Sequence, residues 1–426
     1  MNSIALCAAA LITYLVLAYR TRDLLAPSAL LCLFWFSAAA LAEVTTLKDP
    51  SLQRPWELET NIAVYLCGIS MFVPGLLQRR QRTRVPIRCE PSAIFRHTIT
   101  MLMLSSVVAV AARLYVFGFS LERLFLEFGG IDLKTEISDA IPGVHYFEIM
   151  TPFLSLCAMF ELSASTRTSK MRRFTLITYV LYSVFIYCTV LSASRGALLV
   201  ILTGGLYLYA QNGRLRFIHL LTIGAFIIAG MSGLSFLRIS SESVSNSFLG
   251  DNLLMSFLSP IYTYVAFNFE NFNSLVQANT DPSYIFYSLK FLLWPLLKSD
   301  YESGAIMLTN FDTLFFNART FLYPFYHDLG LIGCVLYPML ISLALTFLRN
   351  STTQFPGRVI LLMGLQKSIW FAFFGNYFFG ELSIVIPLFL LGILATIYPH
   401  TRRKIQGRIF TDRSHSKNSS TPIYET

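Results

Sequence analysis

Long apolar runs alternate with short polar connections along almost the whole chain. Apolar runs of about 20 residues match the length of a helix that crosses the hydrocarbon core of a bilayer. The pattern therefore predicts an all-α, polytopic membrane protein with eleven transmembrane helices. The predicted spans are 2–19, 24–42, 60–77, 97–117, 144–163, 174–192, 196–210, 217–236, 327–347, 359–377 and 382–398.

Composition supports one membrane domain rather than several soluble ones. The chain is 54% hydrophobic and 13% charged, whereas a soluble domain averages about 25% charged residues. Basic residues follow the first span rather than precede it, so we expect that span to be retained. We predict a transmembrane domain over 1–410 and a polar, disordered cytoplasmic tail over 411–426.

The distribution of basic residues predicts the orientation. Two thirds of the 33 lysines and arginines fall in alternate connections and the tail, the pattern that marks the cytoplasmic side. The N-terminus is then outside and the C-terminus cytoplasmic. The net charge of +9 is dispersed among short loops, so nucleic acid is not an expected partner.

Three predicted external connections are substantial, at 43–59, 118–143 and 237–326. A connection as long as the third is usually structured or functional. Within it, the stretches 255–269 and 283–297 are apolar but short. We interpret them as interfacial or re-entrant helices.

No metal or cofactor is expected from the motifs. The seven cysteines are scattered without a CxxC spacing, which indicates neither a disulfide framework nor a zinc site. The predicted external segments contain no Asp-x-Asp for a metal-dependent sugar transfer. The chain also contains no Gly-x-Ser-x-Gly, Walker A or His-Glu-x-x-His stretch.

Four arginines lie at membrane depth on the predicted outer side: Arg113, Arg195, Arg238 and Arg319. An arginine inside a bilayer costs about 2.5–3.5 kcal/mol on insertion scales, so it usually faces a cavity or a partner. Guanidinium is permanently charged and binds phosphate with two parallel hydrogen bonds. These arginines are therefore candidate pyrophosphate ligands. The alternative is that they extend to lipid headgroups or pair with a glutamate.

His327 and Asp328 begin the predicted ninth span, a few residues after Arg319. Histidine titrates in the range that a general base requires. Asp328 is a base, a residue that orients His327, or a helix cap whose negative charge is stabilised by the positive end of the helix dipole. Tyr323 and Tyr326 are typical of the aromatic belt at a membrane interface.

Two stretches point to a known family, "SRGALL" after the sixth predicted span and "FLYPFYHDLGLIG" leading into the ninth. In these stretches the chain resembles the Wzy-type oligosaccharide repeat-unit polymerases. The span pattern and the one large external loop resemble that family as well. The resemblance implies a GT-C-like fold in a bacterial inner membrane and metal-free transfer of a glycan from undecaprenyl pyrophosphate. Arg195 and Arg319 would then stabilise the leaving group, and His327 or Asp328 would be the base. Membrane lipids, a flippase and a chain-length regulator are the further partners it implies.

Three other functions remain open from the sequence. An O-antigen ligase would use the same lipid-linked donor to deliver glycan to a lipid core. A flippase or transporter of lipid-linked oligosaccharide would show pseudo-repeats, mid-span charges and short loops on both sides. A structural membrane subunit would use its arginines only to bind headgroups.

Overall fold

The protein is described by a computed structural model that covers residues 2–44, 53–80, 93–116, 144–164, 182, 195–211, 218, 222, 224–225, 253–289, 293, 296–297, 319–350, 356–375, 378 and 389–394. Over these residues the chain forms helices and turns, and no strand occurs among them. The predicted all-α class is therefore confirmed for this part of the chain.

Eight of the eleven predicted spans coincide with helices of the described part. They are α1 (Asn2–Thr21), α2 (Pro27–Ala42), α3 (Leu58–Gly75), α4 (Ala93–Val116), α7 (Val144–Ala164), α9 (Arg195–Gln211), α14 (Leu322–Asn350) and α15 (Pro356–Trp370). By length and apolar composition, α1, α3 and α14 are each able to cross a membrane. The predicted spans 174–192, 217–236 and 382–398 lie largely outside the described residues, so the count of eleven stays a prediction.

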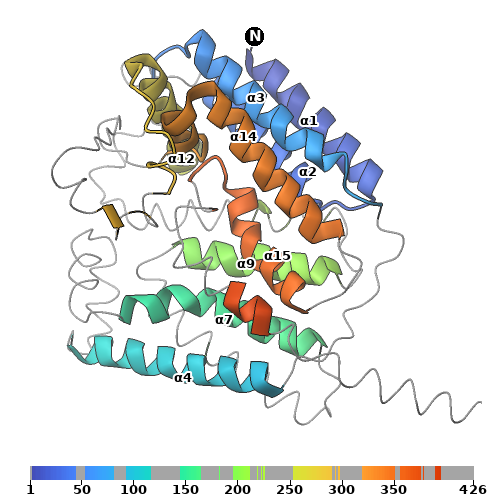
Figure 1. Cartoon of the computed structure of the whole chain (residues 1–426), viewed down its shortest axis with the longest axis vertical. Helices are drawn as coiled ribbons and strands as arrows, with labels where there is room; N and C mark the ends of the chain where they lie inside the picture. Colours follow the sequence, from blue (N-terminus) through green and yellow to red (C-terminus); the bar gives the residue numbers. More distant parts are fainter. Residues whose placement is uncertain are drawn as a thin grey trace, which may run out of the picture.

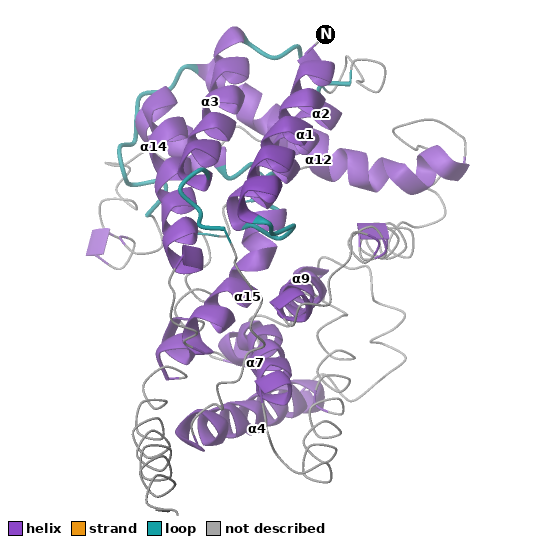
Figure 2. Ribbon diagram, turned by 90° about the vertical axis from the view of Figure 1, so that its right-hand side faces the viewer, coloured by secondary structure: helices purple, strands orange, loops and turns teal. Residues whose placement is uncertain are grey.

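The helices pack in a continuous succession (Figure 1). Helices α1, α2, α3 and α14 lie side by side, and α15 contacts α2. Helix α9 packs on α15, α7 packs on α9, and α4 packs on α7 at the far end. Figure 2 shows the same order of helices from the side. One apolar core connects them, with Trp35 of α2 fully buried within it.

A long helix stands where the sequence predicts only a short interfacial or re-entrant helix over 255–269. Helix α12 (Leu253–Ala278) lies inside the predicted connection 237–326. Its second half carries buried polar side chains, at Asn268, Glu270, Asn271 and Asn273. Buried polar groups require partners. The extended segment 53–57 and the start of α3 provide them for Glu270 and Asn273, as described below, and Asn268 donates to the Tyr264 carbonyl within α12.

The starts of α1, α3 and α14, which the charge pattern places on the outer side, lie close together in the structure. Asn2, at the start of α1, donates to Asn61 near the start of α3, and the Tyr65 hydroxyl donates to Asn2 Oδ1 over 3.0 Å. Tyr326, near the start of α14, donates to Glu59 Oε1 over 2.8 Å. Each of these positions belongs to the predicted outer side. The alternation of the helices is thus consistent with the predicted topology.

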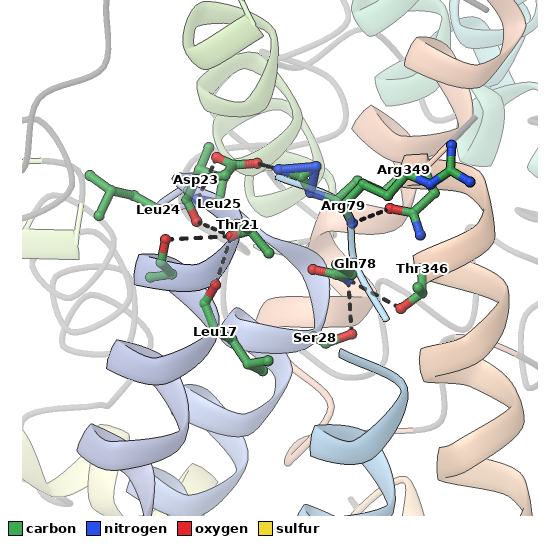
Figure 3. Close-up of polar contacts among 12 residues, drawn as sticks. Leu17, Thr21, Asp23, Leu24, Leu25, Ser28, Gln78, Arg79, Thr346 and Arg349 are labelled. Atoms are coloured by element: carbon green, nitrogen blue, oxygen red, sulfur yellow. Dashed lines mark hydrogen bonds and ion pairs between the residues drawn. The ribbon is translucent and has the colours of Figure 1, made fainter. Parts of the chain in front are cut away.

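The opposite ends meet in a buried polar cluster (Figure 3). Arg349, at the end of α14, pairs with Asp23, which follows α1, and their side chains are 6% and 4% exposed. Gln78, which follows α3, donates to Ser28 of α2 over 3.0 Å and to Thr346 of α14 over 3.2 Å. Four helix ends are therefore joined by polar contacts at the predicted cytoplasmic side.

Helix α14 changes direction at Gly330. This residue has φ 60° and ψ −142°, close to a region that essentially only glycine occupies. The break divides α14 into a short first part and a long apolar second part. The two parts approach closely, because a Cβ placed on Gly333 would lie 2.0 Å from the carbonyl oxygen of Phe325. The two glycines of "DLGLIG" thus have separate physical roles, one in dihedral angles and one in packing.

We predict that the two glycines respond differently to alanine. Gly330→Ala should lower the free energy of unfolding by about 1–3 kcal/mol through backbone strain, because no atom of the described residues lies within 4 Å of its added Cβ. Gly333→Ala should cost more, because Phe325 must move. Thermal unfolding of detergent-solubilised protein would measure both.

Gly205→Ala on α9 is the matched control for this comparison. Its added Cβ meets only Met159 Sδ, at an ordinary 3.6 Å, and alanine is favoured over glycine in a helix by about 0.5–1 kcal/mol. This variant should be at least as stable as wild type. Equal melting temperatures for all three variants would contradict the close approach at Gly333.

We also predict that removing one partner of the buried ion pair costs more than removing both charges. Arg349→Met leaves the Asp23 carboxylate buried without its cation, a change that typically costs about 3–5 kcal/mol. The double variant Asp23→Asn/Arg349→Met should recover much of that loss, since the asparagine still accepts the Leu25 N–H that Asp23 Oδ1 now accepts at 3.0 Å. Additive losses in melting temperature would show that the pair is not coupled.

Candidate functional site

The segment just before α14 fixes the position of Arg319. Phe321 is fully buried and packs edge-on against Trp35, with ring centroids 5.2 Å apart. The Phe321 N–H donates to the Ala372 carbonyl, 3.0 Å away, just after α15. A buried aromatic anchor and a backbone hydrogen bond therefore hold the chain two residues after Arg319.

Asp328 binds a second segment, 283–289, against the first part of α14. Its Oδ1 accepts the Ser283 hydroxyl at 2.6 Å and the Tyr287 N–H at 2.8 Å, and its Oδ2 accepts the Ser288 N–H at 2.9 Å. The side chain is completely buried. Because three donors satisfy one carboxylate, Asp328 organises this segment much as a capping residue organises a helix start.

Further contacts fix the turn that contains Ser283. The Ser283 N–H donates to the His327 carbonyl at 2.9 Å. Tyr284 has a φ of 56° and Asn279, just after α12, a φ of 45°, so the backbone between α12 and this turn bends through left-handed conformations. The sequence predicts a helix over 283–297; its described beginning, 283–289, is instead a series of turns.

His327 lies between Ser283 and an aromatic ring. Its Nδ1 is 2.9 Å from the Ser283 Oγ. The Tyr287 ring stacks on the imidazole with centroids 4.6 Å apart and an interplanar angle of 27°. The histidine is only 3% exposed. A hydrogen bond and a stacking contact from the 283–289 segment therefore help to set its orientation.

Two tyrosines join Arg319 to the histidine. The Arg319 guanidinium donates to the Tyr287 hydroxyl. It also lies over the Tyr323 ring, 4.9 Å from the centroid, a cation–π contact worth about 0.5–2 kcal/mol. Because Tyr287 contacts both Arg319 and His327, a permanent cation and a titratable base are held in one assembly at the N-terminal end of α14.

A polar contact network supports this assembly from the side of α12. Arg54 Nε donates to Glu270 at 2.9 Å, and Thr60 donates to Asn273 at 2.8 Å. Tyr326 packs edge-on against Phe272 of α12 while its hydroxyl binds Glu59. The segment 53–60, α12 and the start of α14 are thus connected to one another.

The structure brings together three of the six predicted site residues. Arg319, His327 and Asp328 lie in the assembly just described. Arg195 is the first residue of α9 and Arg113 lies on α4, but their side chains are outside the described part, as is the whole of Arg238. Their predicted roles stay predictions.

The sequence missed two members of the site and misjudged a third. Ser283 and Tyr287 lie about forty residues before His327, in a stretch whose apolar character concealed them. Nothing in the local pattern distinguishes them from other serines and tyrosines there. The aromatic-belt interpretation of Tyr323 is wrong, because its side chain is completely buried beneath Arg319.

Among the residues that the structure describes, no group of three or more His, Cys, Asp or Glu side chains is placed to hold a metal ion. The chemistry offered by the described site is that of a guanidinium, an imidazole and hydroxyl groups. Such groups bind anions and move protons.

Comparison of the chain with family models, with curated proteins and with solved structures finds no match.

We predict that Asp328 variants separate a positioning role from a chemical one. Asp328→Asn keeps one acceptor oxygen for Ser283 and Tyr287 but places an amide against the Ser288 N–H, so it should lose about 1–3 kcal/mol of stability. Asp328→Ala leaves all three donors unpaired and should lose several times more. Melting temperature and protease resistance in detergent would measure the difference.

Lowered but measurable activity in Asp328→Asn, beside a destabilised Asp328→Ala, is the result expected of a positioning residue, because asparagine keeps an acceptor for Ser283 and loses only the charge. Abolished activity in Asp328→Asn at wild-type stability would instead identify the carboxylate as the base.

Proposed function

We propose that this chain is a membrane glycosyltransferase of the outer face of a bacterial inner membrane. Its reaction would polymerise undecaprenyl-pyrophosphate-linked oligosaccharide repeat units into a surface polysaccharide such as O-antigen. The observation that carries the proposal is the assembly of Arg319, Tyr287 and His327, which holds an anion-binding cation beside a candidate base. The resemblance of "SRGALL" and "FLYPFYHDLGLIG" to repeat-unit polymerases supports the same reaction.

The location of the assembly suits a lipid-linked substrate. It lies at the end of α14, a helix long and apolar enough to cross a membrane. A pyrophosphate carried on a polyprenyl chain would lie at the depth of such a helix end. No nucleotide supply exists on the outer face, so an activated sugar there must arrive on a lipid.

In the proposed reaction, a hydroxyl oxygen of the incoming repeat unit forms a bond to the anomeric carbon of the donor glycan. The bond between that carbon and the pyrophosphate oxygen breaks, and its electron pair leaves with undecaprenyl pyrophosphate. The hydroxyl proton passes to His327. The Arg319 guanidinium stabilises the charge that develops on the leaving pyrophosphate.

Each described partner of Arg319 has a role in this scheme. The Tyr287 hydroxyl and the Tyr323 ring restrict the guanidinium to one region, which lowers the entropy lost when the anion binds. Arg195, at the start of α9, is a second pyrophosphate ligand in the proposal. Arg113 and Arg238 are further candidates.

We predict that the surface glycan of a deletion strain collapses to a single repeat unit and that wild type restores the ladder. Arg319→Ala, Arg195→Ala and His327→Gln should fail to restore it, with polymer lowered about 100-fold or more, the usual effect of losing one charge-stabilising group. Arg319→Lys should restore it only in part, because lysine cannot bind phosphate with two parallel hydrogen bonds. Gel analysis of the glycan, with membrane levels checked by blot, gives the result.

Arg20→Ala is the control. Arg20 is an exposed arginine in the last turn of α1, at the predicted cytoplasmic side and so away from the assembly of Arg319, Tyr287 and His327. It should restore the full ladder. A deletion that leaves the ladder unchanged would overturn the proposal and favour transport of a lipid-linked substrate. A deletion that leaves the lipid core without any glycan would identify a ligase instead.

A further inference from the structure

The hydrogen atom of the Ser283 hydroxyl decides how His327 is protonated. Ser283 Oγ lies 2.6 Å from Asp328 Oδ1, 2.9 Å from His327 Nδ1 and 3.2 Å from the His327 carbonyl oxygen. A hydroxyl has one hydrogen to donate. The carboxylate is the charged acceptor and the nearest of the three, and hydrogen bonds to ionised oxygens are the shortest and strongest. The hydroxyl therefore donates to Asp328.

The contact between Ser283 Oγ and His327 Nδ1 then fixes the imidazole. With its hydrogen directed to Asp328, the hydroxyl presents a lone pair to Nδ1. Two lone pairs 2.9 Å apart would repel, so Nδ1 must carry a hydrogen and donate it to Ser283. A neutral imidazole carries one hydrogen, and its remaining lone pair is on Nε2.

We infer that Ser283 is a positioning residue, which links the Asp328 carboxylate to His327 and holds the imidazole with its hydrogen on Nδ1 and its lone pair on Nε2. The role of Nε2 as the base that accepts the sugar hydroxyl proton rests on the proposed function; the tautomer does not. The chain Asp328–Ser283–His327 inserts a hydroxyl where a carboxylate commonly contacts a catalytic histidine directly.

Three contacts hold the hydrogen-bonded series Asp328–Ser283–His327 in place. The Ser283 N–H binds the His327 carbonyl at 2.9 Å, so the serine is tied to the residue that it orients. The Tyr287 N–H binds the same Asp328 oxygen as the hydroxyl, and the Tyr287 ring stacks on the imidazole. Rotation of the ring would break either the stacking or the hydrogen bond at Nδ1.

The arrangement also stabilises the histidine after it has accepted a proton. An imidazolium donates from both nitrogens, so its Nδ1–H keeps the same bond to Ser283. The Asp328 charge acts through the polarised hydroxyl and favours the cation. No group has to move when the proton arrives.

The first test is the tautomer itself, read by nitrogen and carbon NMR of histidine-labelled full-length protein in detergent. The spectrum of His327→Gln assigns the His327 signals by difference. Wild type should show neutral His327 with its hydrogen on Nδ1. Ser283→Ala should move the signals toward the other tautomer, and Ser283→Thr should keep the wild-type pattern because it retains the hydroxyl.

Ser288→Ala is the matched control for this experiment. The Ser288 N–H bonds to Asp328 whatever the side chain, and its buried Oγ has no hydrogen-bond partner in the structure. This variant should leave the His327 signals unchanged. A wild-type spectrum with the hydrogen on Nε2 would overturn the inference, even if Ser283→Ala did not fold. So would a folded Ser283→Ala with unchanged signals.

The second test is polymer formation by the same variants. Ser283→Ala should lower polymer formation about 10-fold or more, which is part of the roughly 10²–10⁴-fold that a positioned base contributes. Ser283→Thr should recover most of that loss. If Ser283→Ala changes the tautomer as predicted but deletion of the whole protein leaves the ladder unchanged, the positioning inference stands and the proposed function is refuted. Normal polymer formation by Ser283→Ala, alongside a ladder lost in His327→Gln, would refute the inference alone.

Discussion

The end of the molecule where α14 begins depends on the hydrogen bonds that the Asp328 carboxylate accepts. It is buried where α14 changes direction, and it accepts one hydroxyl and two backbone N–H groups from the segment 283–289. Burying a carboxylate is costly unless its oxygens find donors. Those donors come from a segment about forty residues away in the sequence. The hydrogen bonds that satisfy the carboxylate therefore also bring that segment against α14 and assemble the site. Together with the Arg319 hydrogen bond to the Tyr287 hydroxyl, that contact holds Tyr287 against His327.

The break at Gly330 makes this interaction possible. A continuous helix would carry His327 and Asp328 along the same axis as the apolar second part of α14. The glycine dihedral angles instead allow the first part to turn back until Phe325 lies against Gly333. The two residues then lie at a corner, where they meet segments from outside the helix. Backbone strain that only glycine tolerates is thus placed next to the candidate chemistry, as often happens at functional sites.

The two ends of the α1, α2, α3 and α14 group use charge in contrasting ways. At the predicted cytoplasmic end, Arg349 pairs with a buried carboxylate, and amides and hydroxyls of four helix ends join the cluster. That arrangement fixes helix positions. At the other end, Arg319 donates to a tyrosine hydroxyl and lies over a tyrosine ring. The first arrangement joins helix ends, and the second orients a guanidinium beside His327.

The sequence by itself determined eight helices of the described part, because long apolar segments satisfy their backbone groups most readily as helices. It also identified Arg319, His327 and Asp328, because polar groups beside an apolar run stand out. It did not reveal that Ser283 and Tyr287 belong to the site, or how long α12 is. The roles of such serines, tyrosines and asparagines depend on which residues they contact, and the local pattern does not show those contacts. It allowed three roles for Asp328, and only the tertiary structure, by bringing the donors of 283–289 to its oxygens, favoured positioning. The local pattern of polar and apolar residues predicts which environment a side chain requires. Its hydrogen-bond partner about forty residues away depends on the tertiary structure.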